Sequence, residues 1–338
     1  MQAVVLDAPG ALAVREIALE ADERLVTVQV EQVGVCGTDR AVVDGSVPVR
    51  TPRVIGHEVV GRVRGGGPGH LAIGDRVLLD PSVWCGTCGT CRRGLLHLCP
   101  RGGLMGRDVD GGLADFVTAP PDRLHVVPGS VPDADAALLQ VLGTCVHAQR
   151  AVPQVAGARA VVVGLGVSGQ LHVQLLNAWG AAAVVGVGRS PEKRRLAERL
   201  GAAVTCTPDE AAQVVAGETG GEGADVVVEA VGSGATVALA AELAGFASTV
   251  VVFGTSPSGV SEAPLHELYR KEVRVVHPRA ATGADYDDAI ALVASGSVRG
   301  APLVTDRLPL AAAPAVFASW GDRRDRLKVV FGPAASAR

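Results

Sequence analysis

Four of the seven cysteines in this 338-residue chain lie within a stretch of only fifteen residues. They form a C-x2-C-x2-C-x7-C cluster made of Cys85, Cys88, Cys91 and Cys99. Four thiolates at such spacings can surround one zinc ion tetrahedrally, and four sulfur ligands leave no position for water or a substrate. The cluster therefore predicts a structural zinc site. Two disulfides are the alternative interpretation, but they would need an oxidising compartment, which nothing else in the sequence indicates.

A second and different set of metal-ligand side chains lies upstream of this cluster, namely Cys36 and the adjacent pair His57 and Glu58. A thiolate, an imidazole and a carboxylate are ligands of a catalytic zinc that keeps one position for a substrate oxygen. Taken alone, a free cysteine or a single histidine is more often a packed structural residue. The neighbouring four-cysteine cluster favours the metal interpretation.

Composition excludes several classes of function. A hydrophobic content of 48% over 338 residues is enough for two packed domains. The net charge of −4, without a long Lys/Arg run, argues against a nucleic-acid partner. The amino-terminal sequence has no basic segment followed by an apolar run, and no apolar stretch approaches eighteen residues. We therefore expect a cytoplasmic protein with no membrane partner.

The hydrophobic pattern changes along the chain, and the change predicts an α/β protein with two domains. The first part shows short β segments at Ala3–Leu6, Arg24–Val33, Glu58–Val63, Arg76–Leu79 and Phe116–Ala119. From about residue 153, apolar strands alternate with glycine turns and helical patterns, as in βαβ units of a parallel sheet. The predicted elements there are Ala160–Val163, Gly169–Trp179, Ala183–Val187, Pro191–Leu200, Asp225–Glu229 and Thr249–Phe253, and a last strand is expected at Leu327–Phe331.

A glycine-rich turn connects the first of these strands to its helix. The run reads Gly164, Leu165, Gly166, Val167, Ser168 and Gly169. In this position a G-x-G-x-x-G sequence makes a tight turn and presents backbone N–H groups to a pyrophosphate. The strand before it, the helix after it and a second strand ending about twenty residues later predict a dinucleotide site.

The end of that second strand discriminates between cofactors. NAD sites usually place an acidic residue there for the ribose 2′-hydroxyl, whereas this chain has Gly188, Arg189 and Ser190. The absence of a carboxylate leaves room for a 2′-phosphate, with which Arg189 can pair, and Lys193 lies one helical turn further. This pattern favours NADP over NAD. Arg189 would alternatively stack on adenine or face solvent in an NAD enzyme.

With these motifs in order, the chain resembles the zinc-dependent medium-chain dehydrogenases almost from end to end. The segments are G-V-C-G-T-D around Cys36, G-H-E around His57, the four-cysteine cluster and the glycine-rich turn. The resemblance implies a β-rich, GroES-like catalytic domain over residues 1–150 and 280–338. It implies a Rossmann domain with a doubly wound parallel sheet over residues 151–279.

The resemblance also implies roles for individual residues. Cys36 and His57 would bind the catalytic zinc, Glu58 would be a ligand able to approach or leave it, and Thr38 would take the substrate proton. Asp39 would orient a ligand. For the remaining ligand position Gln140 occupies the place where the family commonly has glutamate, as some related glucose dehydrogenases have Gln, and Cys145 is its rival.

The family resemblance implies an oxidoreductase with two zinc ions per chain, one catalytic and one structural. Zinc would polarise a secondary alcohol, and hydride would pass to the nicotinamide. The expected substrate is a polyhydroxylated alcohol or its ketone, such as a sugar, a polyol or an aminocyclitol, and the expected assembly is a homodimer or homotetramer. The alternatives are a threonine-type or simple secondary-alcohol dehydrogenase, and a protein that binds NADP(H) and zinc without turnover.

Overall fold

The computed structural model of the chain describes residues 1–19, 22–66, 69, 71–255, 264–323 and 325–332. It separates into two compact units. Unit 1 comprises Met1–Gly143, Ala281–Ser295 and Gly300–Arg338, and unit 2 comprises Thr144–Ala280 and Gly296–Arg299. The sequence placed the two boundaries at 150/151 and 279/280, whereas the structure assigns residues 144–150, Ala280 and Gly296–Arg299 to unit 2.

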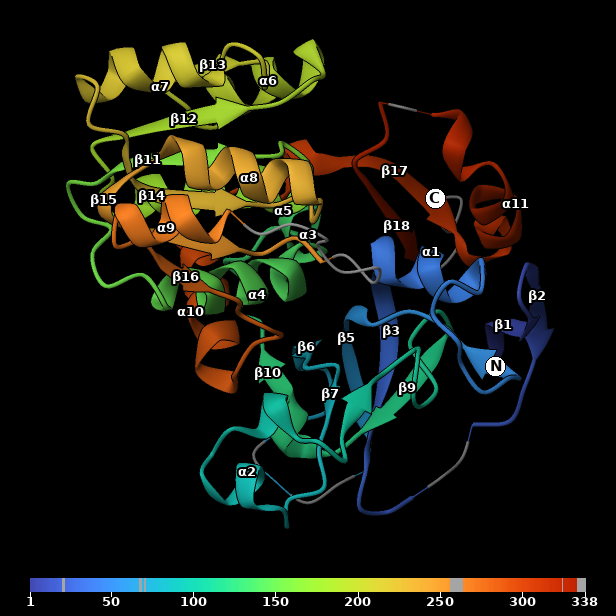
Figure 1. Ribbon diagram of the computed structural model, residues 1–338. Helices are drawn as coiled ribbons and strands as arrows, with labels where there is room; N and C mark the ends of the chain where they lie inside the picture. Colours follow the sequence, from blue (N-terminus) through green and yellow to red (C-terminus); the bar gives the residue numbers. More distant parts are fainter. Residues whose placement is uncertain (20–21, 67–68, 70, 256–263, 324, 333–338) are drawn as a thin grey trace. The chain divides into compact units, whose positions relative to one another are not determined.

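Unit 1 is built from β-sheets (Figure 1). Its largest sheet, counted over the described residues, has seven strands in the order β10-β6-β5-β3-β18-β17, with β9 also paired to β3. All neighbours are antiparallel except β17 and β18. The strands are β3 (Val26–Val35), β5 (Glu58–Gly65), β6 (Arg76–Leu79), β9 (Phe116–Ala119), β10 (Leu124–Val126), β17 (Val304–Pro309) and β18 (Lys328–Gly332).

Smaller elements complete unit 1. One small sheet has the order β2-β1-β4 and another pairs β7 with β8. The strands are β1 (Gln2–Ala8), β2 (Ala11–Glu16), β4 (Arg53–Val54), β7 (Ser82–Val83) and β8 (Gly103–Leu104). The helices are α1 (Gly37–Val43), α2 (Gly89–Arg92), α3 (Asp133–Ala136), α10 (Gly283–Ala294) and α11 (Ala313–Ala318), and α4 (Leu139–Arg150) crosses the boundary between the units.

Unit 2 contains a parallel sheet with helices on both faces (Figure 1). Within the described part of the chain its strand order is β13-β12-β11-β14-β15-β16. The strands are β11 (Arg159–Val163), β12 (Ala183–Val187), β13 (Val204–Cys206), β14 (Ala224–Glu229), β15 (Ala244–Val252) and β16 (Arg274–Val276). The helices are α5 (Val167–Ala178), α6 (Pro191–Arg199), α7 (Ala211–Thr219), α8 (Gly234–Leu243) and α9 (Leu265–Arg270). This arrangement confirms the predicted α/β class.

Runs of consecutive valines explain why helices pack on both faces of this sheet. Val162 packs with Val173 and Leu176 of α5, whereas its neighbours Val161 and Val163 belong to the core formed with α7 and α8. Successive side chains of a strand point to opposite faces, so a continuous run of valines requires apolar cover on each. The sequence located these strands well because such runs are local signals.

Two predicted elements differ from the structure at their ends. The strand expected at Arg24–Val33 is β3, which spans Val26–Val35, and the helix expected from Gly169 begins at Val167 as α5. The later end of β3 places Cys36 immediately after the strand. Within the described residues no helix is both long and apolar enough to cross a bilayer.

Candidate functional site

Strand pairing brings the three upstream metal-ligand residues together. Cys36 follows β3, Glu58 begins β5, and the antiparallel register pairs Gly34 with Glu58. The Cys36 Sγ lies 3.1 Å from His57 Nε2, and these two atoms and a Glu58 carboxylate oxygen all lie within 4.8 Å of one another. Cys36 and His57, 21 positions apart in the sequence, and the adjacent Glu58 therefore bring a sulfur, a nitrogen and an oxygen close together.

Asp39 fixes the orientation of the His57 ring. Its Oδ1 lies 3.0 Å from His57 Nδ1, and its Oδ2 accepts a 2.9 Å hydrogen bond from the Cys36 backbone N–H. Burial by itself would lower the pKa of His57, but the Asp39 carboxylate and the Cys36 thiol outweigh burial and raise the pKa well above its usual value. A ring whose Nδ1 donates to a carboxylate keeps Nε2 facing the sulfur, which is how metal-binding histidines are held.

Lys328 is the partner of Glu58, and sequence analysis missed it. The Lys328 ammonium group donates to both Glu58 oxygens, at 2.8 Å to Oε1 and 2.7 Å to Oε2, and to the Val35 carbonyl at 3.2 Å. The side chains of Lys328 and Glu58 are 2% and 1% exposed. Gly34 leaves the space for this carboxylate, because a Cβ there would collide with Glu58 Oε2.

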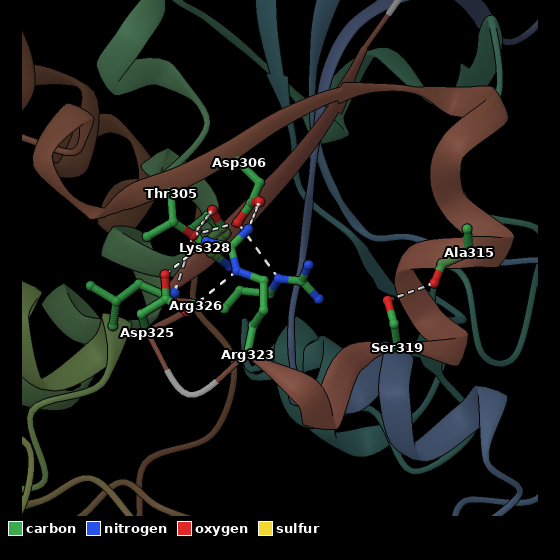
Figure 2. A network of polar contacts seen from close by, with 9 residues as sticks. Thr305, Asp306, Ala315, Ser319, Arg323, Asp325, Arg326 and Lys328 are labelled. Atoms are coloured by element: carbon green, nitrogen blue, oxygen red, sulfur yellow. Dashed lines mark hydrogen bonds and ion pairs between the residues drawn. The ribbon is translucent and has the colours of Figure 1, made fainter.

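Lys328 begins β18, which pairs with β17, and Figure 2 shows the network of polar contacts that contains Lys328, Thr305, Asp306 and Arg323. The Thr305 hydroxyl lies 3.2 Å from the Lys328 carbonyl and 2.8 Å from an Asp306 carboxylate oxygen. Arg323 bonds to the other Asp306 oxygen at 2.6 Å. The late strand β18 therefore places the buried Lys328 ammonium group against the carboxylate of Glu58, 270 residues earlier in the sequence. No short motif encodes such a contact. The one local hint is that Lys328 is a charged residue inside the apolar strand pattern Leu327–Phe331.

The other expected site residues lie nearby in sequence or on α4. Thr38 is half-buried, and its backbone N–H donates to Cys36 Sγ at 3.2 Å. Gln140 is buried in α4, and its Nε2 donates to the Tyr286 hydroxyl at 3.4 Å. Cys145 points its Sγ toward the Ser168 carbonyl, at 3.9 Å. Gln140 and Cys145 thus face different neighbours.

The four-cysteine cluster is assembled as a cage. Four of the six sulfur–sulfur distances among Cys85, Cys88, Cys91 and Cys99 lie between 3.4 and 4.0 Å, all four sulfurs lie within 4.8 Å of one another, and all four residues are free thiols. A zinc ion with four sulfurs at about 2.3 Å places them about 3.8 Å from one another, so the cage fits zinc. The spacing also excludes a disulfide, whose sulfurs would be about 2.05 Å apart.

The glycine-rich turn joins β11 to α5 as the sequence predicted. Gly164 has a φ of 98°, a conformation that favours glycine, and Gly166 is the residue before the first turn of α5. Gly169 lies against the Gly164 carbonyl with no room for a side chain. No side chain caps the start of α5, so the backbone N–H groups of its first turn can face a pyrophosphate.

At the end of β12, Arg189 is exposed, and Ser190 caps α6 by accepting the Lys193 N–H at 3.3 Å. A cation outside the predicted set also belongs to this turn. Arg194 Nη1 donates to the Gly188 carbonyl at 2.8 Å and to the Arg189 carbonyl at 3.3 Å. The sequence analysis missed Arg194 because its bonds to these carbonyls form only when the first turn of α6 packs against the end of β12.

Comparisons with known proteins agree with this geometry. Residues 22–129 match the alcohol dehydrogenase GroES-like domain, and residues 166–295 match the zinc-binding dehydrogenase family. The 2-dehydro-3-deoxy-L-galactonate 5-dehydrogenase of Pseudoalteromonas atlantica is 32% identical over 310 residues, 90% of each chain. The chain belongs to the zinc-dependent medium-chain dehydrogenases.

Two further relatives support an enzyme of this family that acts on CH–OH donors with a nicotinamide cofactor. The L-threonine 3-dehydrogenase of Bacillus velezensis is 28% identical over 86% of each chain. A Sinorhizobium meliloti protein solved bound to NADP is 32% identical with a TM-score of 0.92, and the match covers 98% of this chain and 99% of that protein. The expected class of protein, oxidoreductase of alcohols, is thereby confirmed.

Proposed function

We propose that this enzyme transfers hydride between the secondary alcohol of a small polyhydroxylated compound and NADP, giving a ketone. The observation that carries the proposal is the convergence of Cys36, His57 and Glu58, with His57 oriented by Asp39. Sulfur, imidazole and carboxylate from three residues leave a coordination position for a substrate oxygen, whereas the closed four-cysteine cage does not.

Cys36 and His57 would hold a catalytic zinc ion, with Glu58 or Gln140 as a variable further ligand, and the cage would hold a second, structural zinc ion. Zinc at the first site supplies a Lewis acid that polarises a substrate oxygen. Asp39 keeps the His57 ring in the binding tautomer. Lys328 draws the Glu58 carboxylate toward itself, so Glu58 approaches a metal only when that pair lengthens.

The Thr38 hydroxyl would accept the substrate proton. The Thr38 backbone N–H donates to Cys36 Sγ, so the start of α1 holds Thr38 next to the proposed metal ligand Cys36. The nicotinamide cofactor supplies the hydride acceptor. We assign NADP because Arg189 is exposed beside Gly188, where a carboxylate would repel a 2′-phosphate.

The substrate class rests on the relatives and on the ligand set. A 2-dehydro-3-deoxy-L-galactonate 5-dehydrogenase and a probable D-xylulose reductase from Emericella nidulans, 28% identical, both act on polyhydroxylated compounds by their names. Because two L-threonine 3-dehydrogenases from Bacillus species are also similar to this chain, a threonine-type substrate is the second candidate. A sugar, a polyol or an aminocyclitol remains our proposal.

We also propose a cytoplasmic homodimer or homotetramer. All seven cysteines are free thiols, as zinc binding in a reducing compartment requires. In unit 2 the edge strand β16 and the adjacent α9 expose Val275 and Tyr269, 41% and 83% accessible. A sheet edge without a further strand in the described part of the chain, with exposed apolar side chains, favours association between copies. Light scattering of the purified protein tests the assembly.

Turnover measured across sugars, polyols, aminocyclitols, simple secondary alcohols and threonine, each with NADP and NAD, tests the function. We expect activity on a polyhydroxylated alcohol and its loss in the Cys36→Ser variant. Activity confined to threonine or simple alcohols would contradict the substrate class. Cofactor and zinc binding without turnover of any compound would instead identify a binding protein.

A further inference from the structure

A buried carboxyl group lies at the end of β14 in unit 2. Glu229 is 0% exposed. Its Oε1 accepts hydrogen bonds from the backbone N–H groups of Val231 and Gly232, both at 2.8 Å, while its Oε2 has no hydrogen-bond partner among the described residues. A buried polar atom without a partner costs folding free energy. The position therefore requires an explanation beyond packing.

The place of Glu229 in the sheet supplies the functional context. Chain order reverses between β11 and β14, and Glu229 pairs in register with Val163, the last residue of β11. In open parallel sheets, ligands bind outside the carboxyl ends of the strands at such a reversal. Glu229 thus lies beneath the crevice that the family's nicotinamide cofactor occupies.

The turn held by Glu229 is tied directly to the glycine-rich turn. The Ala230 N–H donates to the Val163 carbonyl at 2.8 Å. The Val231 side chain lies over Gly164, where a Cβ would collide with it, yet Val231 remains 49% exposed. One surface of Val231 therefore rests on the first glycine, and the other is open.

The turn 230–232 is closely packed at Gly232, and the Glu229 carboxyl group accepts hydrogen bonds from two of its backbone N–H groups. Gly232 has a φ of 87°, and a Cβ there would lie 2.6 Å from the Thr255 backbone nitrogen. Two consecutive N–H groups that point at one oxygen form a small anion-binding concavity. In this chain the Glu229 side chain occupies that concavity and fixes the direction of both groups.

We propose that Glu229 is a positioning residue for the cofactor: its carboxyl group holds the turn 230–232 so that Val231 forms one wall of the nucleotide crevice against Gly164. The proposal rests on cofactor binding by the family and does not depend on the substrate or on the catalytic zinc. Removal of the carboxyl group should release Val231 and weaken the nucleotide contact.

Calorimetric titration of the zinc-loaded protein with NADPH and NADH tests this role. Glu229→Ala should raise the Kd of the preferred nucleotide on the order of tenfold, which corresponds to about 1.4 kcal/mol. Glu229→Gln, which keeps an oxygen acceptor, should bind nearly as the wild type. The matched control is Asp225→Ala at the other end of β14, where Oδ2 accepts the Arg159 N–H at 2.7 Å; it should leave the Kd unchanged.

A double-mutant cycle separates positioning from general loosening. If Glu229 acts through Val231, then Glu229→Ala and Val231→Ala together should raise the Kd little more than the larger single effect. Additive effects, an unchanged Kd in Glu229→Ala, or an equal rise in Asp225→Ala would each overturn the proposal. If Glu229→Ala does not fold, Glu229→Asp carries the test, because its shorter side chain cannot reach both N–H groups. Wild-type protein that binds neither nucleotide would instead contradict the proposed function.

Discussion

The Lys328 ammonium group and the Glu58 carboxylate form a two-oxygen ion pair, at 2.8 and 2.7 Å, across 270 residues of sequence. Both side chains are almost fully buried. Because an unpaired charge in the interior is costly, each group depends on the other. While held by Lys328, the Glu58 carboxylate has an oxygen within 4.8 Å of the ligand atoms of Cys36 and His57. One ion pair therefore links folding with the proposed metal site.

Breaking this pair from one side should destabilise the protein. Lys328→Met leaves the Glu58 carboxylate buried without its cation, and we expect a loss of about 3–5 kcal/mol in the free energy of unfolding. Urea unfolding of the single variants and of Lys328→Met combined with Glu58→Met measures the coupling. The double variant should be more stable than Lys328→Met alone. Simple additivity of the two losses would show that the groups do not depend on each other.

Elemental analysis should find two zinc ions per chain. Cys36→Ser should retain one zinc ion, and Cys88→Ser should lose the structural ion together with much of the folding stability, since binding of structural zinc contributes to folding. Cys206→Ser is the matched control, because Cys206 is buried in β13 outside both clusters and should keep both ions. One ion that survives Cys36→Ser and disappears in Cys88→Ser would leave the chemistry site without a metal.

Thr38→Val should lower turnover by about 10²–10⁴-fold, the usual contribution of an acid–base group. The Kd for the cofactor should change little, since the substitution removes a hydroxyl group without altering the nucleotide-binding unit. Thr38→Ser, which keeps the hydroxyl group, is the control and should be mild. Equal turnover of wild type and Thr38→Val would mean that the alcohol proton leaves by another route.

Steady-state kinetics should show a preference for NADP of roughly ten- to a hundredfold in kcat/KM, as expected for a charge-assisted pair with Arg189. Gly188→Asp should shift the preference toward NAD. A Cβ at residue 188 would lie only 3.0 Å from Leu165 Cδ1, so Gly188→Ala must be measured to separate packing from charge. A wild-type preference for NAD would indicate that Arg189 stacks on adenine.

His172 should make the protein sensitive to acid. Burial lowers its pKa to about 3, and its ring packs on Phe253 with centroids 4.9 Å apart. The unfolded chain binds this proton near pH 6.5, so the stabilising contribution is complete above that pH and declines as pH falls toward 3. From pH 7 to pH 5, the free energy of unfolding should fall by about 2 kcal/mol less in His172→Leu than in the wild type. Exposed His266→Gln is the control, and an unchanged pH dependence in His172→Leu would contradict the assignment.

Much of the candidate site could be predicted because its signals are local. The spacing of Cys85 to Cys99 indicates one cage, and the run from Gly164 to Gly169 follows a strand and opens a helix, as the structure shows. Lys328 and Arg194 could not be predicted in the same way. Their partners are a distant side chain and backbone carbonyls, and no spacing in the sequence encodes such contacts.

The sequence by itself determined the α/β class, the change from short β segments to alternating strands and helices, and the residue types available for metal and nucleotide binding, because turns, apolar runs and ligand spacings act over a few residues. The tertiary structure decided which of those groups meet. The register of β3 with β5 places Cys36 near Glu58, and the pairing of β18 with β3 places Lys328 in contact with the Glu58 carboxylate. Sheet register depends on cores assembled from distant segments, so these contacts exist only in the folded chain.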